Sequence, residues 1–145
     1  MIEHRSAVVV LIVLLVVCRA VGRNNTTAAG RYREYSELIS VIGSEISIPC
    51  NVTATMPDDQ VTLILWYKDD SGNPIYSVDT RQVFGVAPKK FASKELESRA
   101  TFNISRTVAI LNIKPVKEND GGEYRCRVDF RRSRTMNSVM KVIVI

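Results

Sequence analysis

From residue 36 onward, the apolar residues fall into short β-branched runs separated by turn residues. Residues 46–52 show the clearest alternation, because apolar side chains including Cys50 share one face while polar residues and Pro49 occupy the other. No stretch of useful length has the periodicity of a helix. The pattern therefore predicts an all-β domain of about 110 residues.

Eight strands are expected in this domain, with room for a ninth near residues 82–86. Polar turn segments such as residues 69–74 separate them. Pro49 cannot donate a backbone hydrogen bond, so its strand should contain a bulge or lie at an edge. The expected strands are residues 38–42, 46–52, 61–68, 75–78, 100–104, 107–113, 123–130 and 138–145.

The chain begins with an apolar segment that predicts export. Residues 7–17 are an unbroken apolar run, and with Cys18 they would form about 18 Å of helix, well short of the ~30 Å hydrocarbon core of a membrane. Small residues precede a cleavage point after Ala20, and cleavage after Gly22 fits nearly as well. The sequence therefore predicts a signal peptide over residues 1–20, with an uncleaved signal anchor as the alternative.

The segment after the predicted signal peptide has a different character. Residues 21–35 are polar and lack a sustained apolar period, which is typical of a flexible leader. Overlapping N-glycosylation sequons begin at Asn24 and Asn25, so this leader is also expected to be glycosylatable.

Charge and cysteine content narrow the function classes. Lys and Arg number 20 against 15 Asp and Glu, and the net charge of +5 permits acidic protein or sulfated glycan partners. Export argues against nucleic acid. Loss of residues 1–20 would remove the only histidine and leave two of the three cysteines, Cys50 and Cys126. An even pair in an oxidising compartment predicts one disulfide.

A catalytic role is not expected. The exported chain would lack histidine, and it contains no nucleophile elbow, metal-ligand spacing or phosphate loop. The oxygen-rich residues 69–73 could be considered as a calcium site, but a solvated hairpin turn fixed by Gly72 and Pro74 is the favoured interpretation. Asp58 and Asp59 are expected to form only a loop. We expect no enzyme, no metal and no cofactor.

The spacing of Cys50, Trp66 and Cys126, with Tyr124 two residues before the second cysteine, is the immunoglobulin arrangement. Residues 119–126, NDGGEYRC, resemble the Asp-x-Gly-x-Tyr-x-Cys signature of V-set immunoglobulin domains. The resemblance implies two packed sheets joined by the disulfide, with the indole covering it. It also implies that the tyrosine hydroxyl ties down the corner before its strand.

The V-set resemblance extends to a charge pair. Arg99 stands where the family has an arginine at the start of a strand, and Asp120 would be its partner. The expected fold over residues 36–145 is therefore a V-set immunoglobulin-like two-sheet sandwich with one inter-sheet disulfide.

Two stretches carry a closer resemblance. Residues 65–79, LWYKDDSGNPIYSVD, and residues 124–131, YRCRVDFR, resemble the first immunoglobulin domain of the Sidestep family of arthropod neuronal surface receptors. The resemblance implies cell adhesion and axon guidance, with Beaten path family immunoglobulin proteins as partners. Family members carry several such domains and a membrane span, so this chain would be an N-terminal fragment whose membrane link lies in a missing C-terminal part.

An alternative function from a different class stays open. The chain could be a soluble secreted immunoglobulin-type module that binds a sulfated glycan or an immune ligand. Either interpretation places it in the secreted fraction or on the extracellular face of the plasma membrane.

Strand parity and the V-set resemblance together predict where a partner protein would dock. If Trp66 and Cys126 point inward, the alternate residues of their two strands point outward, and the resemblance implies that these strands are neighbours in one sheet. Aliphatic and aromatic side chains would then lie beside arginines, which is typical of the centre of a protein interface. The alternative is that C-terminal neighbours or the residues numbered in the 80s cover the apolar side chains. The predicted docking residues on this face are Leu63, Leu65, Tyr67, Arg125 and Arg127.

Two further features bear on binding. Arg131, Arg132 and Arg134 crowd the turn before the last strand and either contact an acidic partner or sulfated glycan, or form a solvated loop. The V-set resemblance implies that the sequons at Asn51 and Asn103 lie on the opposite sheet, where glycans would leave the docking face free. The residues on either side of Asn103, Phe102 and Ile104, are expected to face the core.

Overall fold

The structure is a computed structural model that describes residues 36–81 and 87–145. The described residues form nine strands and one 3-10 helix, η1 (Glu118–Asp120). The predicted signal peptide, the leader with Asn24 and Asn25, and the expected ninth strand at residues 82–86 lie outside the described residues. Within the described residues, no helix combines the length and the apolar character that a membrane span requires.

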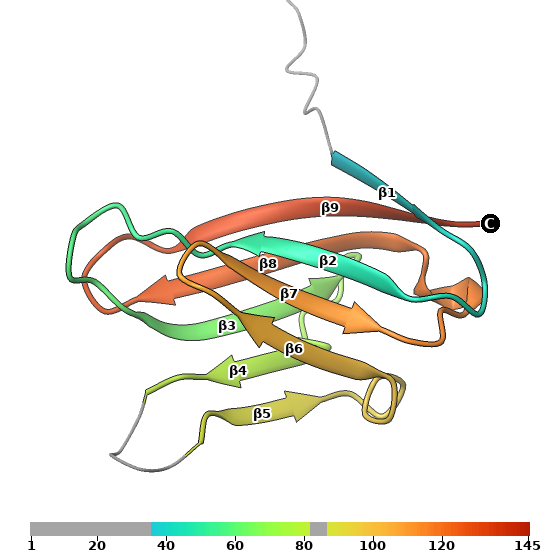
Figure 1. The fold of residues 1–145 in the computed structure, drawn as a ribbon, viewed down its shortest axis with the longest axis horizontal. Coiled ribbons are helices and arrows are strands. Elements are labelled where there is room, and N and C mark those ends of the chain that lie inside the picture. The colour runs from blue at the N-terminus through green and yellow to red at the C-terminus, as the bar shows by residue number, and fades with distance from the viewer. Residues whose placement is uncertain (1–35, 82–86) are drawn as a thin grey trace, which may run out of the picture. The chain divides into compact units, whose positions relative to one another are not determined.

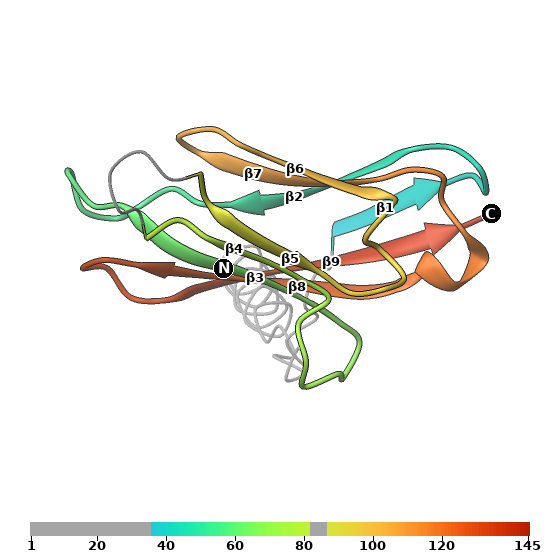
Figure 2. The same cartoon turned by 90° about the horizontal axis from the view of Figure 1, so that it is seen from below.

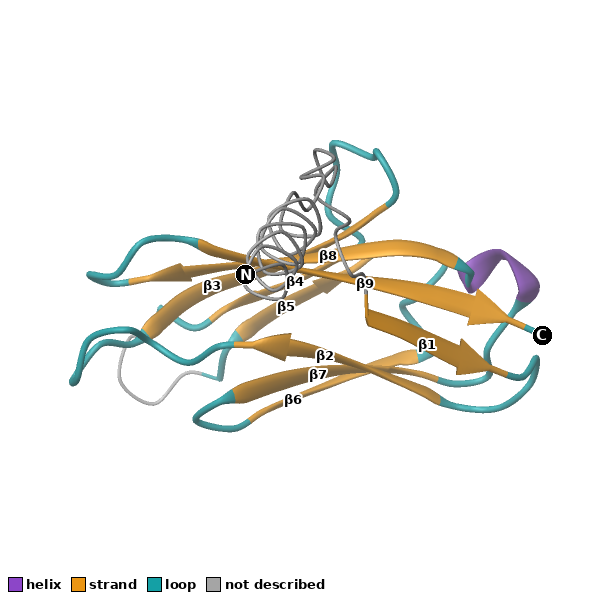
Figure 3. Cartoon of the chain, turned by 90° about the horizontal axis from the view of Figure 1, so that it is seen from above, coloured by secondary structure: helices purple, strands orange, loops and turns teal. Residues whose placement is uncertain are grey.

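The strands form two sheets that pack face to face, as Figure 1 shows and the turned views of Figures 2 and 3 make clear. β1 pairs with β9 in parallel, and every other pairing is antiparallel. The six-stranded sheet has the order β1 (Ser36–Ser40), β9 (Met136–Val144), β8 (Gly122–Phe130), β3 (Val61–Lys68), β4 (Tyr76–Asp79) and β5 (Lys89–Ala92). The three-stranded sheet has the order β2 (Ile46–Asn51), β7 (Val108–Ile113) and β6 (Ala100–Ile104).

The all-β sandwich predicted from the sequence is confirmed. β3 and β6 have the predicted bounds, and the other predicted strands differ at their ends by one or two residues. β5 is the exception, because no strand was predicted at Lys89–Ala92. Its sequence, KKFA, is short and half charged, and its strand conformation comes from antiparallel pairing with β4.

The core lies between the two sheets, and strand alternation fills it. β2 alternates strictly between buried and exposed residues, and β8 does so along most of its length. The disulfide between Cys50 and Cys126, with an S–S distance of 2.02 Å, joins the two sheets, which confirms the predicted pairing. Trp66 is the cross-strand neighbour of Cys126 and is 1% exposed. The sandwich is therefore pinned covalently beside its largest buried side chain.

Pro49 lies at a sheet edge, as expected from its missing N–H. It occupies the middle of β2, which has a neighbour only on the β7 side. The β2–β7 register is unbroken, with Pro49 opposite Ile110. An edge strand needs backbone donors toward one neighbour only, so the proline does not interrupt the ladder.

A buried ion pair closes the end of the sandwich where η1 lies. Arg99 donates from Nη1 to Asp120 Oδ2 at 2.7 Å and from Nη2 to Oδ1 at 3.0 Å, and both side chains are 6% exposed. Two main-chain carbonyls, those of Glu95 and Pro115, accept the remaining bonds of the guanidinium at 3.1 and 2.8 Å. A buried charge pair stabilises a fold only when its other polar atoms are satisfied, and here they are.

Asp120 also accepts hydrogen bonds from residues on either side of it in the sequence. The backbone N–H of Lys117 donates to its Oδ2 at 2.7 Å, and the Tyr124 hydroxyl donates to its main-chain carbonyl at 2.6 Å. Burial alone would raise the pKa of the Asp120 carboxyl, but the hydrogen bonds from Arg99 and Lys117 outweigh it and hold that pKa below its usual value. Burial raises the pKa of the Tyr124 phenol, which stays protonated and donates.

Asp69 holds the hairpin turn after β3 against a neighbouring strand, a contact that the sequence did not indicate. Asp69 has a left-handed φ of 52°. Its backbone N–H donates to the carbonyl of Glu123 at 2.7 Å, and its Oδ1 accepts from the N–H of Glu123 at 2.9 Å. The turn is therefore clamped to the start of β8.

Substitution of Gly122 should break this clamp. Gly122 has a φ of 147°, and a Cβ atom there would lie 2.6 Å from Asp69 Oδ1. Gly122→Ala is therefore expected to lower the free energy of unfolding by about 1–3 kcal/mol in urea titrations. Gly72→Ala is the matched control, because an added Cβ there meets nothing within 4 Å. Equal stability of the two variants would contradict the clamp.

Candidate protein-docking face

The outer face of the six-stranded sheet, which is turned away from the three-stranded sheet, carries the five docking residues predicted on β3 and β8. Ile64 and Trp66 on β3 are 0% and 1% exposed. Their neighbours on the strand therefore point to the outer face, where they are half-buried. The strand register places Leu65 opposite Arg127 and Tyr67 opposite Arg125. The predicted residues thus lie on one face of β8 and β3, which are neighbouring central strands of the six-stranded sheet (Figure 1).

An arginine covers part of the aromatic side chain on this face. The Arg125 guanidinium lies 4.8 Å from the centroid of the Tyr67 ring, which is a cation–π distance. Val139 of β9 is the cross-strand neighbour of Arg125 on its other side. The stacked pair presents a flat, partly apolar surface with a fixed positive charge.

Charged groups surround the two leucines. Leu63 has Asp79 opposite it on β4 and Asp129 opposite it on β8. Arg127 Nε donates to Asp129 Oδ1 at 3.1 Å, and the Thr135 hydroxyl donates to the same oxygen at 2.9 Å. This arrangement of apolar centre and polar surround is typical of protein interfaces.

At the edge of the face, hydrogen bonds from Arg81 stabilise the ionised carboxylate of Asp79. The side chain and backbone N–H of Arg81 donate to its carboxylate and lower the pKa of Asp79 to about 2. The pair is exposed, so it remains ionised and screened by water.

Two exposed apolar side chains on this face were not among the predicted docking residues. Phe91 on β5 is 55% exposed and lies opposite Ser77, which is itself opposite Leu65. Ile39 on β1 is 67% exposed and lies opposite Ile143 on β9. Phe91 was missed because β5 was not predicted. β9 was predicted at residues 138–145, and strand parity relative to Val142, which is 3% exposed, was a usable signal for placing Ile143 on the outer face.

Covering of the docking face by C-terminal neighbours or by the residues numbered in the 80s remains an alternative, because residues 82–86 lie outside the described residues. Among the described residues, Arg125 partly covers Tyr67, and Leu63, Leu65 and Tyr67 each retain part of their surface for contact.

The remaining predicted binding residues lie apart from this face. Arg131, Arg132 and Arg134 are exposed in the turn between β8 and β9, beyond the last paired residue of β3. Asp59 lies in the loop between β2 and β3, as expected, and its carboxylate accepts hydrogen bonds from the N–H groups of this turn, which the sequence did not indicate. The structure therefore separates the candidate residues into a sheet face and a loop end.

The two described sequons lie on the opposite sheet as expected. Asn51 ends β2 and Asn103 lies in β6, and both side chains are exposed. Phe102 packs partly against the core and stacks with Tyr76 at a centroid distance of 6.0 Å. Ile104, predicted to face the core, is instead 41% exposed because it ends an edge strand with a neighbour on one side only.

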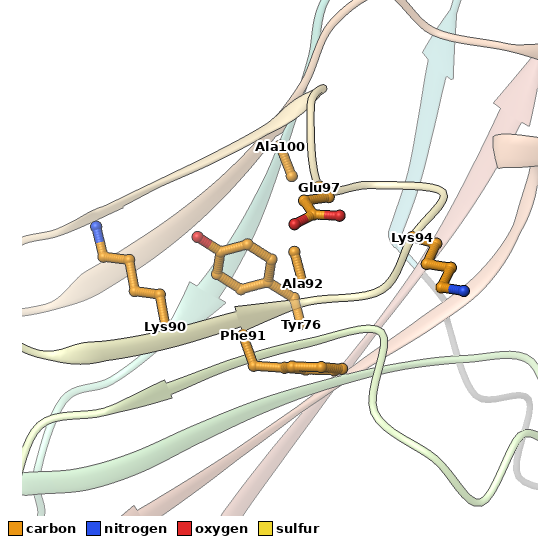
Figure 4. Close-up of a pocket in the computed structure, with 7 residues that line it drawn as sticks. All are labelled: Tyr76, Lys90, Phe91, Ala92, Lys94, Glu97 and Ala100. Carbon is orange, nitrogen blue, oxygen red and sulfur yellow. The ribbon is translucent and has the colours of Figure 1, made fainter.

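Shallow hollows lie along the edge between β5 and β6. One has a volume of about 470 Å³, and Figure 4 shows the Tyr76 ring among its lining residues, with Lys90 and Glu97 nearby. Burial raises the pKa of the Tyr76 phenol. The described residues contain no group of three or more His, Cys, Asp or Glu that could hold a metal ion.

Comparison with known proteins gives a family and a set of structural neighbours. The sequence profile of the immunoglobulin V-set domain matches residues 34–145. No curated protein sequence matches the chain significantly.

The structural neighbours share the fold at low sequence identity. A chain from a photo-crosslinking study of multimeric cell-adhesive interactions of voltage-gated sodium channel (VGSC) beta subunits has a TM-score of 0.57 at 16% identity, covering 77% of this chain and 92% of that one. Extracellular domains of the sodium channel beta4 subunit are described as parallel homodimers with a role in cell–cell adhesion. They have a TM-score of 0.54 at 17% identity, covering 77% of this chain and 92% of that one. A chicken T-cell receptor gives 0.52 at 18% identity, covering 76% of this chain and 47% of that chain.

Proposed function

The chain belongs to the immunoglobulin V-set family, and on this premise we propose that it is an extracellular recognition and adhesion module that docks another immunoglobulin-type protein. The observation that carries the proposal is the outer face of the six-stranded sheet, where Leu63, Leu65 and Tyr67 lie beside Arg125 and Arg127. A V-set domain is typically a recognition module rather than a catalyst.

The composition of the face supports docking. A sheet face that meets only water is normally polar, whereas β3 presents two leucines and a tyrosine at consecutive outward positions. Aromatic and arginine side chains are enriched in the residues that dominate binding energy. The stacked Tyr67 and Arg125 provide both in one preformed arrangement.

The positions of the sequons support the same orientation. Asn51 and Asn103 lie on the three-stranded sheet, so glycans on either residue would cover the opposite side of the domain. We propose that both are used. Residues 1–20 are proposed to be the signal peptide that delivers the chain to the secretory pathway.

The finer proposal is a Sidestep-like axon-guidance receptor whose partner is a Beaten path family protein. Its support is the location of the two stretches that carry the resemblance. Residues 65–79 include the end of β3 and all of β4, and residues 124–131 include most of β8. Both stretches therefore contribute to the docking face, where a shared partner would constrain the sequence.

A substitution in the centre of the face tests the proposal. Leu65→Arg and Tyr67→Ala should each weaken binding to Beaten path family ectodomains by at least ~30-fold, about 2 kcal/mol, because they remove central apolar contacts. Surface plasmon resonance measures the change. Thr101→Arg is the matched control, since Thr101 is exposed on the opposite sheet and its replacement should leave affinity unchanged.

One result would contradict docking through the outer face. Folded Leu65→Arg and Tyr67→Ala proteins, with wild-type melting temperatures, that bind the partner as tightly as wild type would remove the outer face from consideration.

A second candidate function is binding of a sulfated glycan. The observation that favours it is the turn after β8, where Arg131, Arg132 and Arg134 are exposed. None of the three takes part in the salt bridges found among the described residues. Their charge is therefore available to an anionic ligand.

A further inference from the structure

The loops at the two ends of the domain differ in the sign of their charge. The β2–β3, β6–β7 and β8–β9 loops lie at one end (Figure 1), together with the described residues 80–81 and 87–88 that follow β4 and precede β5. The described residues of these segments include five arginines and two aspartates, with no lysine or glutamate. The connections at the other end, residues 41–45, 69–75, 93–99 and 114–121, contain seven acidic and four basic residues. We call the arginine-bearing end the loop end.

One of the two aspartates at the loop end is fully occupied. Asp59 accepts hydrogen bonds from the backbone N–H of Arg132 at 2.9 Å and of Ser133 at 2.7 Å, and also from the Ser133 hydroxyl. The N–H of Gln60 donates to it at 2.9 Å. The carbonyl of Gln60 in turn accepts from the N–H of Arg131 at 2.8 Å. The β2–β3 loop therefore fixes the backbone of residues 131–133.

These contacts keep Asp59 ionised without using the guanidinium groups. Partial desolvation opposes ionisation, but hydrogen bonds from the hydroxyl and N–H of Ser133, and from Gln60 and Arg132, lower the pKa of Asp59 to about 2. The donors are backbone and hydroxyl groups, so the charge of the aspartate orders the turn rather than pairing with an arginine side chain.

The arginine turn, residues 131–134, thus combines a fixed backbone with free charge. A guanidinium group binds a planar or tetrahedral oxyanion through two parallel N–H groups. A fixed backbone reduces the conformational entropy that the arginines lose when they engage such a ligand. Arg106 adds positive charge in a neighbouring loop of the loop end, whereas the charge of Arg81 is paired with Asp79.

The composition of the loop end favours a polyanion over a protein. Protein interfaces have an apolar centre, but Met56 is the one large apolar side chain that is exposed on the described loops of the loop end. Several arginines spread over separate loops instead match a linear polymer that carries many sulfate groups. Binding of that kind depends on charge density and falls steeply with salt.

We propose that Asp59 is a positioning residue that preorganises the arginine turn as a binding site for a sulfated polysaccharide. The inference rests on the second candidate function and uses a surface separate from the docking face. A failure of one therefore leaves the other standing.

The first experiment locates the site with heparin as the probe. The full chain from a eukaryotic secretory host is titrated at several salt concentrations. Arg131→Ser with Arg132→Ser should weaken binding at least ~10-fold and reduce the salt dependence by about two released ions. Arg125→Ser with Arg127→Ser is the matched control, because it removes the same charge from the outer face, and it should change affinity less than ~3-fold. Equal losses in both double variants would overturn the assignment of the site.

The second experiment isolates the role of Asp59. Asp59→Asn adds one positive charge to the protein, so simple charge attraction predicts tighter heparin binding. Loss of the anchor predicts the opposite, and we expect binding ~3- to 10-fold weaker. Asp58→Asn is the matched control, since it makes the same charge change at the adjacent exposed residue and should bind heparin at least as tightly as wild type.

The outcomes separate the inference from the function on which it rests. Wild-type protein that ignores heparin, or prefers poly-glutamate, would overturn both the glycan function and the inference. Heparin binding in which Asp59→Asn and Asp58→Asn behave alike would overturn the inference alone. Melting curves followed by Trp66 fluorescence verify that each variant is folded, and Asp59→Glu should restore part of the affinity.

Discussion

Cys126→Ala is expected to lose about 4–5 kcal/mol of unfolding free energy, most of the stability of an ordinary small domain. The disulfide with Cys50 spans 76 positions of sequence, and an intact bridge of that span restricts the unfolded chain strongly. The bridge also joins β2 to β8, which belong to different sheets. Without it, the two layers are held together by noncovalent contacts and by the loops that connect them.

Urea titration followed by Trp66 fluorescence measures this loss. Trp66 is the only tryptophan of the chain and is 1% exposed, so its emission reports unfolding directly. The urea concentration at the midpoint of unfolding should fall by about 2–3 M in the cysteine variant. The midpoint of wild-type protein treated with a reductant should fall by a similar amount. Native wild-type protein in which both cysteines react with an alkylating agent would disprove the bridge.

Alternation along the chain was sufficient to predict most of the fold. β2 and β8 bury every second side chain along most of their length, so their apolar pattern is visible without any knowledge of their neighbours. β5 lacks that signal because its four residues lie at a sheet edge and are mostly exposed. Its conformation depends on pairing with β4, which a local pattern does not encode.

The candidate sites show the same limit. Parity on two neighbouring strands was enough to place Leu65 beside Arg127 on one face. The contact between Asp59 and Ser133 joins residues 74 positions apart, and an aspartate in a polar loop looks the same in sequence whether it is solvated or hydrogen-bonded. Ile104 was misplaced because parity alone does not show where the facing sheet ends.

Asp120→Ala is expected to lower the free energy of unfolding by about 3–5 kcal/mol, because it leaves the Arg99 guanidinium buried without its counter-ion. It also leaves the N–H of Lys117 without its acceptor. Thermal melts of the two proteins measure the loss. Glu37→Ala is the control, since the Glu37–Lys141 pair is half exposed and should contribute about 0–0.5 kcal/mol.

The pH dependence of this loss follows from the direction of the pKa shift. The hydrogen bonds from Arg99 and Lys117 lower the pKa of Asp120 in the folded state, so the carboxylate stabilises the fold fully above its unfolded pKa of about 3.9. That contribution declines as the pH falls from there through the lower folded pKa. The stability gap between wild type and Asp120→Ala should therefore be constant from pH 5 to 7 and narrow below about pH 4. A gap that widens in acid would mean that the carboxyl is protonated in the native state, and the ion pair could not then be what closes this end of the sandwich.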